Sequence, residues 1–307
     1  MGYLIVGGSG FVGSQVVNWM RQAGIEVDSL SRSSRADIVS DLTAAPPILR
    51  KQGYRTVVHV AGKAHAVPKN DVEREVFFDI NLMGTKNLLI GLEKQATLPE
   101  AFVFVSTVAV YGRTVGELLD EVSPLNADDP YGLSKRLAED VVLEWGAKRH
   151  VQIGILRLPL VAGANAPGNL GAMVNAIRRG RYLGIGDGSA RRSVVLATDV
   201  ARIMPKVADV GGIYNLTDGR HPTFVEIEHA IARVLGKRPP RHLPHTIANA
   251  GARVGDLVLR LTGWRPPLTS STLNKMTSTL TFDDSKARRE LGWNPRSVID
   301  NADEWAK

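Results

Sequence analysis

The chain has 307 residues, which exceeds the usual size of one domain and predicts a large α/β unit with a smaller appended lobe. It contains no cysteine, and this excludes disulfides, thiolate catalysis and thiolate metal sites. The net charge is +7, but the basic residues lie in dispersed short clusters without interleaved aromatic residues, so we expect an anionic small molecule rather than a nucleic acid as the partner.

Targeting and membrane segments are not expected. The first apolar run begins at Tyr3, which leaves no room for a signal peptide. No apolar run approaches the roughly 18 residues that a membrane span needs. We therefore expect a soluble protein of the reducing cytoplasm without a membrane partner.

The chain opens with an apolar run, Tyr3 to Val6, that leads into three glycines spaced three apart. This pattern predicts a buried parallel strand, a tight turn and a helix. Gly7 can take backbone angles that a side chain would forbid, Gly10 lets a ligand approach, and Gly13 lets the helix pack close to the strand. The helix start then faces an anion, for which a dinucleotide pyrophosphate is expected. The predicted contacts are Gly7, Gly10, Phe11, Val12 and Gly13.

A helix predicted over 11–23 is followed by a second strand over 26–30, whose end bears on cofactor choice. An acidic residue there would hydrogen-bond the adenosine ribose, whereas an arginine accommodates a 2′-phosphate. This chain has Ser31 followed by Arg32, and guanidinium pairs bidentately with phosphate. We therefore expect NADP(H) rather than NAD(H), the alternative being that Arg32 is a solvated loop charge.

The next two predicted strands also end in candidate cofactor contacts. A short strand at 38–39 leads to Asp41, which could accept a hydrogen bond from the adenine amino group or cap the segment ahead; the sequence leaves both roles open. A strand at 56–60 ends in small residues where a cofactor can lie close. A lone histidine in the following loop, His65, is more often structural than catalytic. The further predicted contacts are Asp41, Leu42, Val60, Ala61, Gly62 and, after a later strand, Pro159.

A long helical pattern over 71–95 precedes a fifth strand over 101–106, which ends at Thr107. A proline- and acid-rich connection then leads to Tyr131 and Lys135, which are i and i+4 on a helix. This spacing places an ammonium beside a phenol. A cation within a few ångström can lower a tyrosine pKa by about 1–3 units, so we expect the pKa of Tyr131 to be lowered.

Beyond a sixth strand at 152–156 the pattern is less regular. Glycine-rich turns indicate excursions into a second lobe. A strand at 193–196, a helix capped by Asp199 and a strand at 213–216 return to the sheet, and Thr223 and Glu226 form a capping box. The expected fold is a doubly wound parallel sheet, with residues 1–162 as the dinucleotide-binding Rossmann domain, segments near 193–217 returning to it, and 163–307 mainly as a substrate-binding lobe.

Three motifs carry a family resemblance: Gly7-x-x-Gly10-x-x-Gly13, the strand end at Thr107 with its Val110-Tyr111-Gly112, and Tyr131-x-x-x-Lys135. Together they resemble the extended short-chain dehydrogenase/reductases, within the NAD-dependent epimerase/dehydratase family. The branch that the chain resembles includes UDP-glucose 4-epimerases and UDP-sugar 4-ketoreductases. The likeness covers nearly the whole chain and is strongest in its first half.

The resemblance implies roles for individual residues. Tyr131 would be the acid/base, Lys135 would bind the nicotinamide ribose and lower the tyrosine pKa, and Thr107 would hydrogen-bond the reacting sugar oxygen. Arg192 would contact the substrate diphosphate, the alternative being a surface salt bridge, and Asn169 would contact the sugar or a phosphate. The predicted substrate contacts are Thr107, Val108, Tyr131, Asn169 and Arg192. No metal is implied. Related enzymes commonly dimerise through the helices represented here by 71–95 and 131–148.

Two departures from the family pattern narrow the expected activity. The 4,6-dehydratases carry Asp-Glu after the threonine, whereas this chain has Val108 and Ala109, which argues against dehydration. Ser31 and Arg32 replace the acidic residue of NAD-holding epimerases. We therefore expect 4-keto reduction of a nucleotide-sugar ahead of UDP-sugar 4-epimerisation. The alternatives are reduction of a non-nucleotide carbonyl and a non-catalytic dinucleotide-sensing binding protein.

Overall fold

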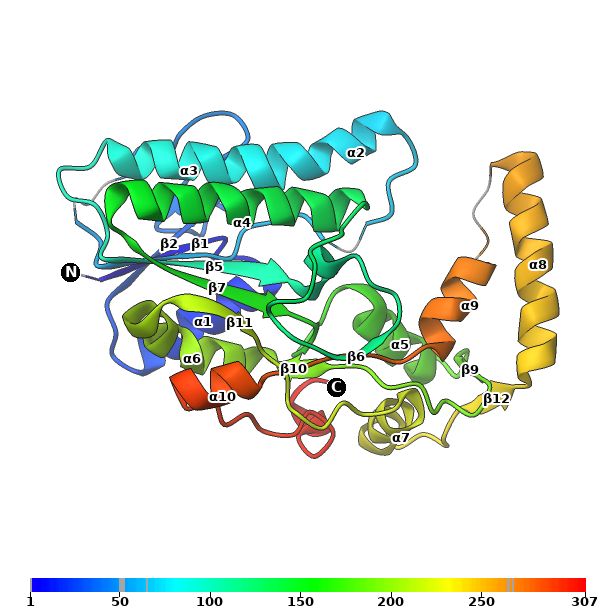
Figure 1. Ribbon diagram of the computed structural model, residues 1–307. Helices are drawn as coiled ribbons and strands as arrows, with labels where there is room; N and C mark the ends of the chain where they lie inside the picture. The colour runs from blue at the N-terminus through cyan, green and yellow to red at the C-terminus, as the bar shows by residue number, and fades with distance from the viewer. Residues whose placement is uncertain (1, 50–52, 65, 264–265, 267) are drawn as a thin grey trace.

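A seven-stranded sheet forms the centre of the fold in a computed structural model that describes residues 2–49, 53–64, 66–263, 266 and 268–307 (Figure 1). Neighbouring strands all run parallel, which confirms the predicted α/β fold. In order across the sheet the strands are β11 (Gly212–Asn215), β7 (Gln152–Leu158), β5 (Ala101–Thr107), β4 (Thr56–His59), β1 (Tyr3–Val6), β2 (Val27–Ser31) and β3 (Ile38–Val39).

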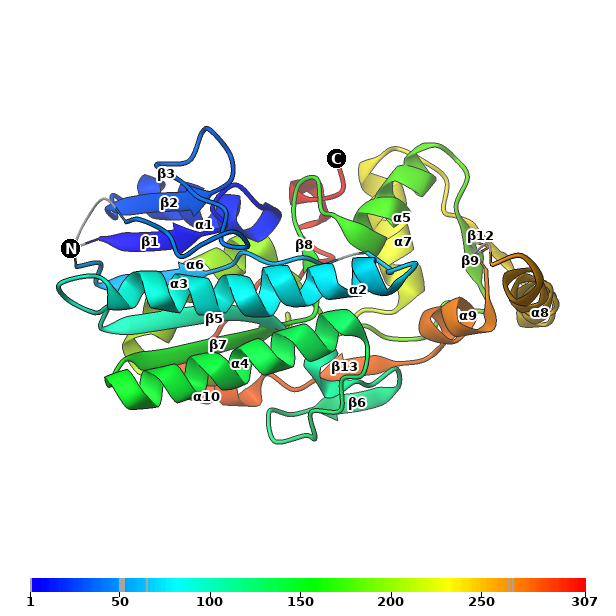
Figure 2. The same ribbon diagram turned by 90° about the horizontal axis from the view of Figure 1, so that it is seen from above.

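Helices cover both faces of this sheet, so its strands are buried on both sides (Figures 1 and 2). Ile5 and Val58 belong to the core beneath one layer of helices, and their neighbours Leu4 and Val57 belong to the core beneath the other. One layer contains α1 (Phe11–Gln22), α6 (Ala197–Val210) and α10 (Ser285–Leu291). The other contains α2 (Asp71–Phe78), α3 (Gly84–Glu93) and α4 (Pro130–Arg149).

The order of the strands places a crevice at a defined point. The chain moves from β1 through β2 to β3 on one side, and from β4 through β5 and β7 to β11 on the other. The strand order therefore reverses between β1 and β4. In open parallel sheets, ligands bind outside the carboxyl ends of the strands at such a switch point.

The remaining elements lie mainly beyond the carboxyl ends of the central strands (Figure 2). Three parallel strand pairs are formed by β8 (Leu160–Ala162) with β10 (Val194–Leu196), β9 (Leu183–Ile185) with β12 (Arg241–Leu243), and β6 (Gly116–Leu119) with β13 (Leu280–Phe282). The helices of this region are α5 (Gly168–Arg178), α7 (Phe224–Val234), α8 (His245–Thr262) and α9 (Ser270–Thr277). Of the returning segments, β11 joins the central sheet, whereas β10 pairs with β8. The domain boundary at residue 162 stays a prediction.

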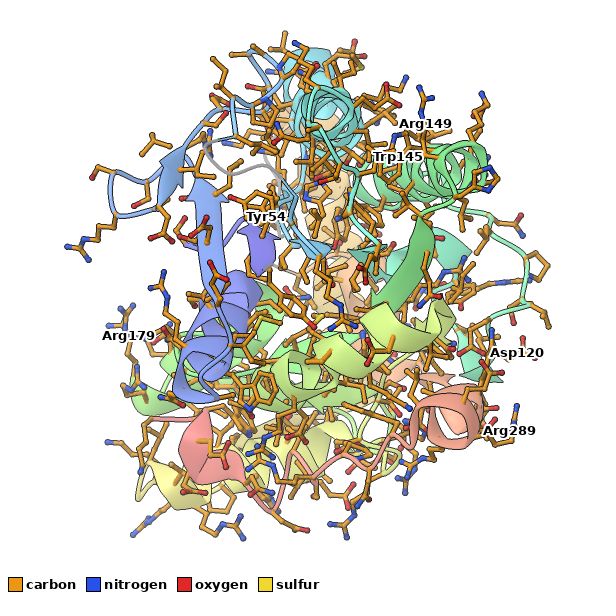
Figure 3. The ribbon with its side chains drawn as sticks, turned by 90° about the vertical axis from the view of Figure 1, so that its left-hand side faces the viewer. Tyr54, Asp120, Trp145, Arg149, Arg179 and Arg289 are labelled. Atoms are coloured by element: carbon orange, nitrogen blue, oxygen red, sulfur yellow. The ribbon has the colours of Figure 1, made fainter. Side chains whose placement is uncertain are left out.

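Polar contacts join the paired helices α3 and α4 of one layer. Trp145 and Arg149 lie close together on α4 (Figure 3). The Trp145 indole N–H and the Arg149 guanidinium both donate to the Glu93 carboxylate at the end of α3, at 3.0 and 2.8 Å. The two helices are therefore linked by polar contacts at one end as well as by apolar packing. Within the described ranges, none of the helices is both long and apolar enough to cross a membrane.

Two local predictions need correction, and one is confirmed. The helix predicted over 71–95 is interrupted by a π-helical turn, Asp79–Met83. Asp199 does not cap its helix, because Leu196 occupies the N-cap position; the Asp199 carboxylate accepts hydrogen bonds from the Arg296 backbone N–H at 2.7 Å and from its Nε at 2.9 Å. The capping box of Thr223 and Glu226 is present at the start of α7.

Candidate active site

The glycine turn after β1 has little room for side chains. Gly7 has a φ of +89°, and a Cβ placed on it would lie 2.5 Å from the Ala61 backbone nitrogen. A Cβ on Gly13 would lie 2.1 Å from the Gly7 carbonyl oxygen. Both positions therefore require glycine, for the backbone and packing reasons predicted from the sequence. Ala61 follows β4, so the ends of β1 and β4 meet at the switch point.

Gly10 differs from the other two glycines. A Cβ on Gly10 would have only the Gly7 carbonyl oxygen near it, at 3.2 Å, and its φ of −77° is accessible to any residue. Gly10 is the N-cap residue of α1. The N–H groups in the first turn of a helix, here those of Phe11 and Val12, have no intrahelical acceptor. Open space in front of a helix N-terminus fits an anionic diphosphate. The cofactor contacts themselves stay predictions.

Substitutions at Gly10 and Gly13 are expected to separate binding from folding. Gly10→Ala should leave the free energy of unfolding within about 1 kcal/mol of wild type, but lower the affinity for NAD or NADP roughly 10-fold or more, because its methyl group enters the ligand's space. Gly13→Ala should lower the free energy of unfolding by roughly 1–3 kcal/mol or more, because its methyl group meets backbone. Thermal unfolding and calorimetric titration of each dinucleotide measure both quantities. Unchanged affinity in Gly10→Ala would contradict the assignment.

The end of β2 is compatible with either dinucleotide. Ser31 is buried, and its hydroxyl accepts a hydrogen bond from the Ser33 backbone N–H at 3.1 Å. Arg32 is exposed. Asp28, the nearest preceding acid, lies inside β2 and accepts a hydrogen bond from the Tyr54 hydroxyl at 2.9 Å. It is therefore engaged within the protein, and its position inside the strand is too early for it to reach the ribose.

Asp41 and Leu42 stabilise the loop that follows β3. The Asp41 carboxylate accepts hydrogen bonds from the Thr43 backbone N–H at 3.0 Å and from its hydroxyl at 2.8 Å. Leu42 is buried, and its carbonyl accepts a hydrogen bond from the Asn87 amide at 2.7 Å. Asp41 thus caps a turn, which favours the capping alternative, and its contact with adenine stays a prediction.

Thr107 and Tyr131 come together from two elements. Thr107 is the last residue of β5, and Tyr131 lies in the first turn of α4, where its N–H donates to the capping Asp129 carboxylate at 3.1 Å. Burial raises the pKa of Tyr131 above its usual value, the hydrogen bond with Thr107 lowers it, and the nearby Asp129 charge raises it. The net shift is upward, so the predicted lowering of the Tyr131 pKa is wrong for this structure.

The position of Lys135 explains that correction. Its ammonium donates to the Val105 carbonyl at 2.8 Å and lies 4.4 Å from the centroid of the Phe104 ring. Burial lowers the pKa of Lys135 to about 8, although the Glu139 carboxylate opposes this. The ammonium is thus directed toward β5 rather than the phenol. It still borders the crevice, because a Cβ on Gly62 would lie 3.2 Å from the Lys135 Nζ.

The backbone after β4 is held at the same crevice. The N–H groups of Val60 and Ala61 both donate to the Val6 carbonyl, at 2.8 and 2.9 Å. The loop then passes Gly62, over Lys135. The predicted cofactor contacts at 60–62 therefore lie beside the glycine turn. His65, the histidine singled out in this loop, falls outside the described residues.

Asn81 is a buried polar residue of the site to which sequence reasoning gave no role. Its Oδ1 accepts from the Lys63 backbone N–H at 2.7 Å, and its Nδ2 donates to the Lys63 carbonyl at 3.1 Å and to the Ser134 hydroxyl at 2.9 Å. Oδ1 would also lie 3.1 Å from a Cβ on Gly62. The π-helical turn is centred on Asn81, and such turns are frequent at functional sites. An asparagine within an otherwise apolar helix face was the available signal.

A hydrogen-bond chain continues from Asn81 to His59. The Thr85 hydroxyl donates to the Asn81 carbonyl at 2.6 Å, so it accepts from the His59 Nε2, which lies 2.9 Å away. The His59 Nε2 therefore carries a proton. Burial lowers the pKa of His59 to about 3, and the Lys135 charge lowers it further.

This histidine is expected to make the fold sensitive to acid. Its pKa is about 3 in the folded state against an ordinary 6.5, so below pH 6.5 the unfolded state binds more protons. The free energy of unfolding should fall by up to about 1.4 kcal/mol per pH unit on acidification through this window. Chemical denaturation from pH 7 to pH 4 measures the slope. His59→Gln should flatten it, and His245→Gln, on an exposed residue, should not; equal slopes in all three proteins would contradict the assignment.

Arg192 is held by backbone carbonyls. Its guanidinium donates to the Arg191 carbonyl at 3.0 Å and to the carbonyls of Lys275 and Ser278, at the end of α9. Burial lowers its pKa to about 10. Arg192 therefore anchors α9, and its contact with a diphosphate stays a prediction.

The other predicted contacts lie on three separate segments. Asn169 is exposed in the first turn of α5, Val108 is half-buried at the start of the 3₁₀ turn after Thr107, and Pro159 is half-buried after β7. Their binding roles stay predictions. Across the described residues, no three His, Asp or Glu side chains gather closely enough to hold a metal ion.

Comparisons with known proteins agree with this arrangement. The N-acetyl-α-D-glucosaminyl-diphospho-ditrans,octacis-undecaprenol 4-epimerase of Escherichia coli O157:H7 is 26% identical over 92% of this chain and 87% of its own length. The UDP-glucose 4-epimerase of Bacillus subtilis is 25% identical over 99% and 96%. The NAD complex of the Thermus thermophilus UDP-glucose 4-epimerase shares the fold, with a TM-score of 0.74 at 22% identity over 100% and 98% of the two chains. Residues 3–217 match the NAD dependent epimerase/dehydratase family model, and the chain belongs to that family.

Proposed function

We propose that the protein oxidises and reduces C4 of a hexose carried on a diphosphate, with 4-epimerisation as the net reaction. The observation that supports this most directly is the pairing of Thr107 with Tyr131 at the crevice that Lys135 and the glycine turn border. The two relatives named above are 4-epimerases, and each matches nearly the full length of this chain. We therefore place epimerisation ahead of the ketoreduction that the sequence favoured.

In this proposal, side chains of the protein exchange the proton with the C4 oxygen of the sugar. A nicotinamide dinucleotide, when bound, supplies the hydride acceptor and donor. In the oxidising half the Tyr131 oxygen would accept the proton of the C4 hydroxyl, and in the reducing half the phenol would return it to the C4 oxygen of the keto sugar. The raised pKa of Tyr131 favours the protonated phenol that the reducing half needs. Thr107 orients that oxygen and the phenol through its hydroxyl. Lys135, charged below about pH 8, supplies positive charge at the end of β5.

Ketoreduction by NADPH is the second candidate. Arg32 is exposed at the end of β2, where it can pair with a 2′-phosphate. A reductase consumes free NADPH in proportion to product, whereas an epimerase retains its dinucleotide through turnover. Measuring the NADPH consumed per product formed therefore tests the NADP preference and the ketoreductase activity together.

The carrier of the sugar is a nucleoside or a polyprenol, since both present the same diphosphate. UDP-hexoses, UDP-N-acetylhexosamines, the corresponding polyprenyl-diphosphate sugars and, with added NADPH, their 4-keto derivatives are incubated with the purified protein, and both 4-epimers and NAD(P)H absorbance are followed. We expect interconversion of 4-epimers without net cofactor consumption. Stoichiometric NADPH oxidation on 4-keto sugars supports the reductase instead. Binding of dinucleotide without conversion of any substrate supports the non-catalytic alternative.

A homodimer through α2, α3 and α4 is part of the proposal. On one face of the sheet α2 and α3 follow each other end to end, and α4 runs beside them (Figures 1 and 2). Met83, Ile90 and Leu143 are exposed among these helices. Light scattering on wild type and Ile90→Glu tests this interface, and an unchanged mass in both proteins would contradict it.

A further inference from the structure

Helix α8 stands at the edge of the molecule with only one side covered. It lies beyond the carboxyl ends of the central strands, beside α9 and at the end opposite the N-terminus (Figures 1 and 2). Its covered side is made of small residues: Ala248, Ala252 and Gly255 are buried, and a Cβ on Gly255 would lie 2.0 Å from the Leu268 carbonyl oxygen. The helix is therefore packed closely through its smallest side chains.

Val258 and Leu259 of α8 are partly buried, but its other large apolar side chains point away from the protein. These others are exposed and recur at intervals of three, four and seven residues, which forms one stripe along the helix. The four that are most exposed are Ile247 at 58%, Val254 at 62%, Leu257 at 55% and Leu261 at 75%. A helix that only had to pack on the protein would bury these large residues rather than the small ones. We call this set the outer stripe.

The charged residues near the outer stripe are mostly basic. Arg253 and Arg260 are exposed and, at 100° per residue, both fall along one edge of the stripe. The acidic residue of α8, Asp256, accepts a hydrogen bond from the Ser270 backbone N–H at 3.1 Å, toward α9. Between residues 229 and 282 the sequence has eight Lys and Arg and one Asp, an excess equal to the +7 of the whole chain. The surplus positive charge is thus concentrated in the segment that carries the stripe.

We propose that α8 docks on the surface of an anionic phospholipid bilayer. The outer stripe would lie at the boundary between head groups and acyl chains, with Arg253 and Arg260 on lipid phosphates. An apolar stripe with a basic edge is the pattern of helices that lie in this interface. A second copy of the chain fits less well, because pairing the stripe with itself would bring two strongly basic segments together.

This proposal revises one expectation from the sequence. The absence of a long apolar run argued against a spanning segment, and an interfacial helix needs no such run because its apolar residues lie along one face. Docking of α8 would bring the candidate active site close to sugars carried on a lipid diphosphate. This consequence rests on the proposed function, whereas the docking of α8 is argued independently of it.

The test measures docking without substrate or cofactor, so its outcome is independent of the catalytic proposal. The full chain is sedimented with vesicles of phosphatidylcholine alone and with added phosphatidylglycerol. We expect binding to the anionic vesicles that is at least about 10-fold tighter than to the neutral ones and weakens with salt. Val254→Asp/Leu257→Asp and, separately, Arg253→Gln/Arg260→Gln should each lower that binding by about 10-fold or more.

The matched control is Ile48→Asp/Val122→Asp, which changes two apolar residues that are 91% and 88% exposed elsewhere, and it should bind as wild type does. Thermal unfolding of each variant excludes loss of the fold. Three results overturn the proposal: wild type that does not bind anionic vesicles or binds neutral ones equally well, a stripe variant that binds like wild type, or a wild-type dimer that the stripe variant dissociates while neither protein binds vesicles.

Discussion

Tyr131→Phe is expected to lower turnover by roughly 10²–10⁴-fold while leaving dinucleotide affinity near that of wild type. The substitution removes the hydroxyl that contacts Thr107 and leaves the ring packed against Phe77, whose centroid lies 6.3 Å away. The proton donor is therefore lost without a change in the glycine turn. Single-turnover and steady-state kinetics on the active sugar substrate, together with dinucleotide titration, measure the two effects.

Tyr214→Phe is the matched control. Tyr214 is buried in β11, and its hydroxyl donates to Glu290 in α10 at 2.8 Å. Loss of this hydroxyl should change turnover by less than about 3-fold, because Tyr214 lies on β11 whereas Thr107 lies at the end of β5. Turnover that is unchanged in Tyr131→Phe, or equally reduced in both variants, would remove Tyr131 from its proposed role.

Arg157→Leu is expected to lower the free energy of unfolding by about 3–5 kcal/mol, a large part of the stability of a typical domain. Arg157 Nη2 donates to the Glu139 carboxylate at 2.7 Å, and the two side chains are 3% and 1% exposed. Arg157 also donates to the Tyr111 hydroxyl at 3.1 Å. Removing the guanidinium leaves a buried carboxylate without its cation, beside Ser106 near the end of β5, whose hydroxyl also donates to Glu139. Denaturant titration measures the loss.

A surface pair between α4 and α3 provides the comparison. Arg149 and Glu93 are 2.8 Å apart but 49% and 33% exposed, so Arg149→Leu should cost about 0–1 kcal/mol. The double variant Arg157→Leu/Glu139→Leu should recover part of the loss, because apolar replacement of a whole buried ion pair is often close to neutral. Equal destabilisation by Arg157→Leu and Arg149→Leu would show that burial does not set the strength of the inner pair.

The parts of the site that the sequence predicted well are local. The strand, turn and helix around Gly7 depend on neighbouring residues, and the spacing of Tyr131 and Lys135 follows from one turn of helix. The π-helical turn at Asn81 could not be read from periodicity, because it arises where the Asn81 side chain reaches the backbone of Lys63, 18 residues earlier. A regular helical pattern carries no sign of that contact.

The predictions that failed or stayed open depend on distant partners. Arg192 is bound by carbonyls more than 80 residues later in the chain, and Asp199 accepts from Arg296, 97 residues away. The upward shift of the Tyr131 pKa depends on burial and on where the Lys135 ammonium is directed, and helical spacing alone does not contain either. Sequence patterns placed the residue types, and tertiary packing decided their partners.

β13 and the residues after α10 contact segments that are synthesised much earlier, and this affects folding during synthesis on the ribosome. β13 pairs with β6, which lies more than 160 residues earlier, and the Trp293 indole just after α10 donates to the Thr217 carbonyl at 2.9 Å. Trp293 is buried in the core beneath α1 and α6. A nascent chain therefore exposes that apolar surface until residues 280–293 have been synthesised, because the earlier segments lack their packing partners before then.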